Sequence, residues 1–211
     1  MGGAAKAIVA VVVFAIAGGT GYRLYAEQRK KEQQHAVAAL VGDTTVQLRR
    51  ALVVTPPPDL VAQLDVNLKS LSAPRHPQLA DAAGVYIHGA REIVRRRSET
   101  ERLAREAAMS RRALLMHMGA VSSRDAYWIR VASDLKKRVE RDHYELDTSL
   151  KALARILDTL PESQKQLAPH IDASLLLDEA ARRQAREHAV ESAKRAAQEL
   201  DRIRNIGPSR Y

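Results

Sequence analysis

An apolar stripe with alternating spacings of four and three residues runs along most of the chain after Pro77. Residues at these spacings lie on one face of an α-helix, and no strand-like alternation of apolar and polar residues competes with them. No proline interrupts the sequence between Pro77 and Pro161, so long helices can form there. The stripe therefore predicts an all-α fold. Its three parts are Leu79, Ala83, Tyr86, Ala90, Ile93, Arg97, Thr100, Ala104, Ala107, Arg111, Leu114 and Met118; then Trp128, Ala132, Leu135, Val139, Asp142, Leu146, Ser149, Leu153, Ile156 and Leu160; then Ile171, Leu175, Asp178, Arg182, Ala185, Ala189, Ser192 and Ala196, followed after a shift by Leu200 and Ile203.

Apolar residues beside the stripe make it wider than the seam of a two-stranded coiled coil. These flanking residues are Ile87, Val94, Ala108 and Leu115 in the first part and Ile129, Leu150 and Leu157 in the second. A short connection at 119–123, with Ser123 as a candidate N-cap, predicts that two helices of about 55–60 Å lie antiparallel. We therefore expect an elongated antiparallel helical bundle with coiled-coil-like heptad seams.

Prolines divide the chain ahead of this bundle. The run Pro56-Pro57-Pro58 ends a predicted helix of about 22–53, and a short helix is predicted over 59–71. Pro77 suits the first turn of the next helix. The predicted organisation is a transmembrane anchor at 1–25, a juxtamembrane helix with the proline-rich break at 26–58, a helical bundle at 59–206 and a tail at 207–211.

The segment 4–22 is apolar and carries one side-chain charge, Lys6. A bilayer core of about 30 Å requires about 20 such residues in a helix, which this segment supplies if Lys6 reaches the interface. Tyr22 and Tyr25 stand where interfacial aromatic residues are common. The alternative is a cleaved signal peptide, because the run 7–17 has the length of its apolar region and ends in small residues. We predict an uncleaved single span.

Basic residues flanking the anchor bear on its orientation in an inner (plasma) membrane. Lys6 precedes the apolar run, whereas Arg23, Arg29, Lys30 and Lys31 follow it. The excess of Lys and Arg on the C-terminal side slightly favours a cytoplasmic bundle over a periplasmic one. The frequent Ala and Arg residues are compatible with a GC-rich bacterial genome.

Five charged residues interrupt the stripe, namely Arg97, Arg111, Asp142, Asp178 and Arg182. In a slender bundle, long side chains can extend from such positions to the surface, and arginines can pair with aspartates across helices. A second explanation is that buried polar groups set the helix register. The sequence favours the first explanation.

The sequence contains no constellation that predicts catalysis or a metal site. It has no cysteine, which excludes disulfides, cysteine-ligated zinc and iron–sulfur clusters. Glu140 and His143 have the Glu-x-x-His spacing of di-iron bundles, but the second such pair is missing, so surface positions are expected for both. Ser133 and Lys136 match a Ser-x-x-Lys spacing without its companion motifs. We expect no enzymatic activity, no cofactor and no small-molecule substrate.

The chain is basic, with a formal net charge of +9. Five arginines at helical spacing form a stripe on the face opposite the apolar stripe: Arg91, Arg95, Arg102, Arg105 and Arg112. Such an arginine stripe can bind phosphates of lipid or nucleic acid. The alternative is a solvated face on which Glu99, Glu101 and Glu106 pair with Arg95, Arg97 and Arg102 four residues away.

These features lead to three hypotheses of function. The first is a non-enzymatic, single-pass membrane-anchored helical scaffold or protein-interaction module, with a protein partner or a second copy of the chain bound to it. The second is a binder of anionic lipid or nucleic acid that uses the arginine stripe. The third is an accessory helical sensory subunit.

Overall fold

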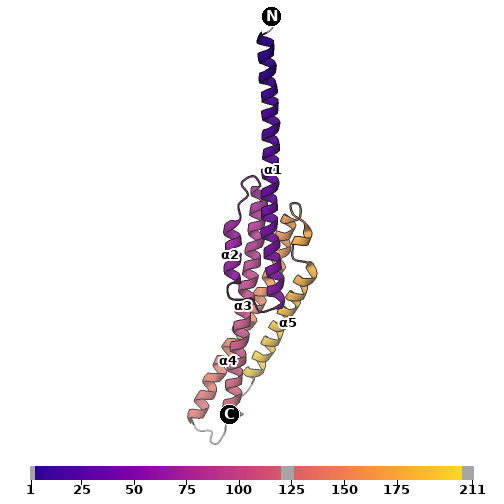
Figure 1. The fold of residues 1–211 in the computed structure, drawn as a ribbon. Coiled ribbons are helices and arrows are strands. Elements are labelled where there is room, and N and C mark those ends of the chain that lie inside the picture. Colours follow the sequence, from indigo (N-terminus) through magenta and orange to yellow (C-terminus); the bar gives the residue numbers. More distant parts are fainter. Residues whose placement is uncertain (1–2, 120–125, 206–211) are drawn as a thin grey trace.

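The structure is a computed structural model that describes the backbone of residues 3–119 and 126–205 and the side chains of residues 25–119 and 126–205. These ranges are helical and contain no strand, which confirms the prediction of an all-α fold (Figure 1). The elements are α1 (Gly3–Val53), α2 (Leu60–Ser70), α3 (Pro77–Gly119), α4 (Ala126–Leu167), the short 3₁₀ helix η1 (Ala173–Leu175) and α5 (Glu179–Arg204).

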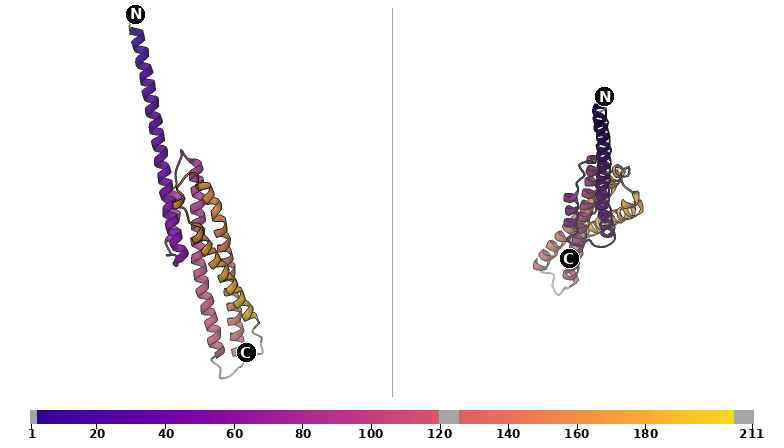
Figure 2. Two further views of the ribbon diagram at one scale, coloured as in Figure 1. Left: turned by 90° about the vertical axis from the view of Figure 1, so that its right-hand side faces the viewer. Right: turned by 45° about the horizontal axis from the view of Figure 1, so that its top comes forward.

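The proline positions predicted the helix boundaries well. α1 ends at Val53, just before the proline run, and α3 begins at Pro77. α2 matches the short helix predicted over 59–71. α3 and α4 lie antiparallel side by side, as expected (Figures 1 and 2). The predicted N-cap Ser123 lies outside the described residues.

The first part of α1 stands clear of the other helices, and only its last part packs against them (Figures 1 and 2). Burial begins at Val37 and continues with Val41, Leu48 and Ala51. These residues belong to the same core as α2, α3 and α4. The buried face of this helix therefore packs within the chain.

No helix within the described part of the chain is long and apolar enough to cross a membrane. The segment 4–22, in which we predict the anchor, lies outside the residues whose side chains the structure describes.

Two apolar cores hold the bundle together. The larger core joins the last part of α1, α2, the first part of α3, the second part of α4 and the start of α5. The smaller one is built on Leu114, Val139 and Ile203 at the far end, where only α3, α4 and α5 continue (Figure 1). The bundle is therefore thickest next to α1 and tapers to three helices.

The predicted stripe of α3 is buried up to Thr100 except at the partly exposed Arg97, together with the flanking Ile87 and Val94. Beyond Thr100 the buried face changes: Leu103 and Ser110 are buried, whereas Ala104 and Arg111, which the stripe placed inside, are exposed. The change follows the end of α1 and α2, which pack on the first part of α3 only. The predicted stripe is confirmed beyond Thr100 at Ala107 and Leu114, which are buried, and is wrong at Ala104 and Arg111. The predicted flanking residues Ala108 and Leu115, and Ile129 in α4, are exposed as well.

Helix α4 continues past Pro161, although proline lacks the N–H that would bond to the carbonyl of Leu157. Arg182 of α5 supplies a donor in its place, because its Nη1 lies 3.3 Å from the Leu157 carbonyl oxygen. The Arg182 side chain is only 15% exposed and also lies 4.0 Å from the Asp158 carboxylate. A charged residue inside the predicted stripe thus satisfies a backbone group that proline leaves open.

The connection between α4 and α5 is held against the bundle by side chains from three helices. Gln34 and Arg49 of α1 donate to the carbonyls of His170 and Leu176 at 2.6 and 2.9 Å. Gln164 of α4 donates to the Leu177 carbonyl, and the Leu177 N–H donates to the Tyr86 hydroxyl of α3. Because Leu176 and Leu177 are buried, the connection is part of the core. The third part of the predicted stripe begins in this connection rather than in α5, whose N-cap is Asp178.

Candidate interaction surfaces

The arginine stripe lies on the outer face of α3, but three of its five members are neutralised. Arg91 binds Asp65 of α2. Arg95 donates to Glu92 at 2.7 and 2.8 Å, and Arg102 donates to Glu106 at similar distances. The stripe therefore does not present a continuous row of free cations to phosphates.

Local glutamates account for much of this neutralisation. The expected pairs Arg97–Glu101 and Arg102–Glu106 are present. The expected pair of Arg95 with Glu99 is absent, because Arg95 bonds to Glu92 three residues earlier and Glu99 bonds to Arg96 at 2.9 Å. The guanidinium of Arg95 holds the pKa of Glu92 below its ordinary value, chiefly through their hydrogen bond.

The last two stripe residues, Arg105 and Arg112, differ from the others. Both are exposed, and neither pairs with a carboxylate within the described residues. Arg105 bonds only to the carbonyl of Glu101 in its own helix, at 3.2 Å. Met109 lies between the two arginines in the sequence, and Met116 follows Arg112. The exposed fractions of the two methionines are 63% and 65%.

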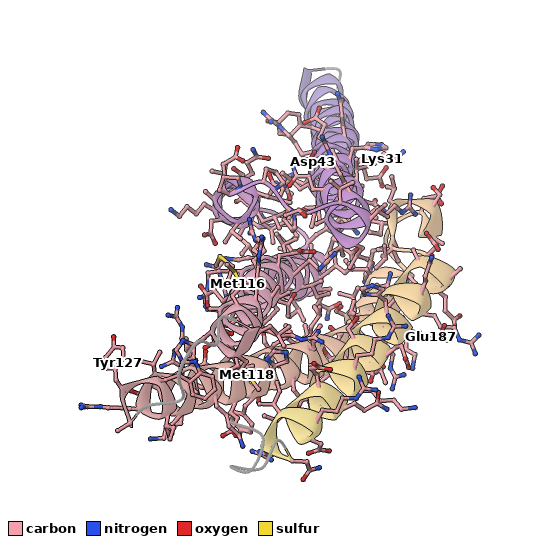
Figure 3. All side chains as sticks on the ribbon, turned by 90° about the horizontal axis from the view of Figure 1, so that it is seen from below. Lys31, Asp43, Met116, Met118, Tyr127 and Glu187 are labelled. Carbon is pink, nitrogen blue, oxygen red and sulfur yellow. The ribbon has the colours of Figure 1, made fainter. Side chains whose placement is uncertain are left out.

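These four residues have spacings of four, three and four, so they lie on one face of α3, which we call the arginine–methionine face. It lies towards the end of the bundle opposite the free part of α1 (Figure 1). Met116 projects from α3 away from α4 and α5 (Figure 3). Sequence reasoning identified the two arginines and missed the two methionines, although their spacing from the arginines was the signal.

A groove lies between the α3–α4 pair and α5, and it consists of two hollows. We call the hollow that residues of α1 also line the upper hollow, and the other one the lower hollow. Their volumes are about 490 Å³ and about 530 Å³. The upper hollow is lined by Arg49, Leu52, Val53, Arg97, Leu150, Leu153, Leu157, Ala181, Gln184, Ala185, His188 and Ala189. The lower hollow is lined by Arg97, Thr100, Glu101, Ala104, Arg111, His143, Leu146, Leu150, His188, Ser192, Arg195, Ala196 and Glu199. Arg97, Leu150 and His188 line both, so the two hollows meet at these residues.

The three arginines of the stripe all pair with acidic residues, and two of them, Arg97 and Arg111, line the groove. Arg97, with 19% of its side chain exposed, pairs with Glu101. Arg111 reaches from α3 to Glu199 of α5 at 2.9 Å, and Arg182 reaches from α5 towards α4. Pairing of stripe arginines across helices is therefore confirmed, although the acidic partners lie outside the stripe.

The other two charged stripe residues, Asp142 and Asp178, also pair with arginines, and Asp178 lies 3.6 Å from Nε of Arg49 in α1. Asp142 is buried beside Arg141 and Arg138 of its own helix. Asp178 caps α5 by accepting a bond from the N–H of Ala181 at 2.7 Å.

The surface position predicted for the Glu140–His143 pair was wrong for His143. This imidazole is buried, and its Nδ1 lies 3.0 Å from the Val139 carbonyl oxygen. It lines the lower hollow because the buried face of α4 is wider than the predicted stripe. Within the described residues, no group of three or more His, Asp or Glu side chains could hold a metal ion.

Comparison with protein-family models, with curated proteins and with solved structures found no match to this chain. The function proposed below therefore rests on the geometry of the arginine–methionine face and of the groove.

Proposed function

We propose that this chain is a non-enzymatic helical interaction module, tethered to a membrane through residues 4–22, that binds an acidic protein partner at the arginine–methionine face. The observation that carries the proposal is that two arginines without a carboxylate partner among the described residues share one face of α3 with two exposed methionines. The absence of enzymatic activity is an inference from the sequence, which contains no catalytic constellation.

The chemistry of the face suits a protein surface. Methionine side chains are flexible and polarisable, so they adapt to an irregular apolar partner. Arginines beside them can pair with carboxylates and steer the encounter. From Arg105 to Met116 the face spans about 17 Å along α3. The complement is an amphipathic helix or ridge that carries acidic residues beside apolar ones.

The tether would give this face a defined position. α1 is one continuous helix from Gly3 to Val53, and Arg75 of the α2–α3 connection donates to the carbonyl of Ala26 at 3.2 Å. Because this contact lies only a few residues after the proposed span, the tether would hold the near end of the bundle close to the bilayer. Since α1 and α3 run roughly along the same axis, the arginine–methionine face would lie at the end of the bundle far from the membrane (Figure 2).

The docking prediction can be tested by photo-crosslinking in cells. With p-benzoylphenylalanine at position 116, we expect a specific crosslinked adduct on irradiation. The double variant Arg105→Glu and Arg112→Glu should reduce that adduct at least tenfold, because charge reversal repels an acidic partner. Neither arginine pairs with a carboxylate in the described structure, so the fold should tolerate the change.

The matched control places the photoreactive residue at Val190, which is 45% exposed on α5. A partner that docks on α3 should give little adduct from this position. Equal adducts from both positions, or an adduct at 116 that survives the double charge reversal, would refute the docking face. A nucleic-acid adduct would instead support the alternative use of the arginines.

The tether makes a separate prediction. The full chain should remain in the membrane pellet after an alkaline carbonate wash, and deletion of residues 1–22 should release it, because these residues supply the apolar length of a span. Release of the full chain by the wash would contradict the tether. A C-terminal fluorescent-protein fusion should fluoresce while a phosphatase fusion stays inactive, because the Lys and Arg count favours a cytoplasmic bundle.

A further inference from the structure

The groove between α5 and the α3–α4 pair has the size and the wall chemistry of a ligand site. Each of its hollows falls in the range of about 300–1,000 Å³ that is usual for small-molecule sites. α5 contributes alanines at 181, 185 and 189 to the upper hollow. Because these side chains are small, they leave space against the leucines of α4.

The upper hollow is mainly aliphatic. Leu150, Leu153 and Leu157 of α4 form one wall, and the alanines of α5 form the other. Its lining contains no Phe, Tyr or Trp, and His188 carries its one aromatic ring. An unbranched alkyl chain matches a narrow, aliphatic space of this kind.

The side chains of an arginine and a histidine lie where the two hollows meet, and a second arginine lies at the upper end. Arg97 and His188 line both hollows. Glu101 pairs with Nη1 of Arg97, and no hydrogen bond from its Nε or Nη2 is formed within the described residues. A guanidinium has five N–H donors, so Arg97 retains donors for an anion. At the upper end, Nε of Arg49 makes no hydrogen bond within the described residues, but it lies 3.6 Å from the Asp178 carboxylate.

We propose that the groove binds an aliphatic carboxylate, with its alkyl chain in the upper hollow and its carboxylate on Arg97 beside His188. The arginine supplies a charge-assisted bond and the leucine–alanine walls bury the chain. The ligand would lie between α4 and α5 and brace α5 against the bundle. This site is separate from the arginine–methionine face, so it stands or fails independently of the proposed docking function.

The test uses the full chain in lipid nanodiscs with decanoate as the probe. Hydrogen exchange is measured along α5 as decanoate is titrated. We expect decanoate to slow exchange of α5 amides, and decanol, which lacks the charge, to require at least tenfold more ligand for the same protection. Arg97→Gln should raise the half-saturating concentration of decanoate at least tenfold, because it removes the charge that holds the carboxylate.

Arg102→Gln is the matched control. Arg102 also pairs with a glutamate four residues later, but it lies 56% exposed on the outer face of α3. This variant should bind decanoate as the unaltered chain does. A second variant, Ala185→Trp, fills the upper hollow and should abolish protection while circular dichroism shows the helices intact.

Two results would overturn the proposal. One is that decanoate leaves the exchange of α5 unchanged. The other is that decanoate and decanol protect equally and Arg97→Gln has no effect, which would mean that the alkyl chain alone partitions into the protein. If Ala185→Trp disturbs the fold, the comparison of Arg97→Gln with Arg102→Gln still decides the question.

Discussion

Replacing Tyr86 by phenylalanine is expected to lower the free energy of unfolding by about 1–3 kcal/mol. Tyr86 is fully buried, and its hydroxyl lies 2.7 Å from Oγ1 of Thr45 in α1. The same hydroxyl accepts the N–H of Leu177 at 3.3 Å. Phenylalanine would leave the Thr45 hydroxyl and the Leu177 N–H without a partner in a core that excludes water. Chemical denaturation followed by circular dichroism measures the loss.

Tyr144→Phe is the control for this prediction. Tyr144 is 58% exposed, so loss of its hydroxyl should change stability by less than about 0.5 kcal/mol. A Tyr86→Phe variant as stable as the Tyr144→Phe variant would show that the hydroxyl does not hold α1, α3 and the α4–α5 connection together.

Because the Tyr86 hydroxyl is buried, we also expect the free energy of unfolding to fall at high pH. Burial raises the pKa of Tyr86 above its ordinary value of 10.0 in the folded chain. The folded state then keeps this proton at pH values where the unfolded state releases it, so stability is retained below about pH 10 and falls above it. The difference in unfolding free energy between the native chain and Tyr86→Phe should therefore shrink from pH 9 to pH 11. A constant difference would contradict the pKa direction.

Replacing Arg182 by methionine is expected to cost about 1–3 kcal/mol, because it removes the donor that Pro161 makes necessary. Methionine keeps most of the aliphatic stem, so the loss reports the guanidinium and its bond to the Leu157 carbonyl. Arg183→Met is the control, since Arg183 is 72% exposed and pairs only with Glu187 in the described structure. It should change stability by less than about 0.5 kcal/mol.

A double-mutant cycle with Pro161→Ala tests the cause. Alanine at 161 restores the helical N–H for the Leu157 carbonyl, so the Arg182→Met change should cost about 1 kcal/mol less in that background. If Arg182→Met costs the same with proline and with alanine at 161, then the bond to the Leu157 carbonyl is not what makes Arg182 important.

The candidate surfaces were predictable only in part. Helical spacing placed the five stripe arginines on one outer face, because that spacing is a local property of the helix. It could not show that Asp65 of α2 neutralises Arg91, since this contact depends on how α2 folds back on α3. The groove was not predicted, because the apolar stripe describes each helix separately and a hollow arises from the distance between helices.

Sequence alone determined the all-helical fold, the helix ends at Val53 and Pro77 and the antiparallel pairing of α3 with α4. Proline geometry and helical periodicity act over a few residues, so they hold wherever the chain packs. Tertiary structure decided the change of the buried face after Thr100, the burial of His143 and the passage of α4 through Pro161. Each of these depends on a neighbouring helix: the ends of α1 and α2 expose one side of α3, and Arg182 of α5 satisfies the carbonyl that the proline leaves free.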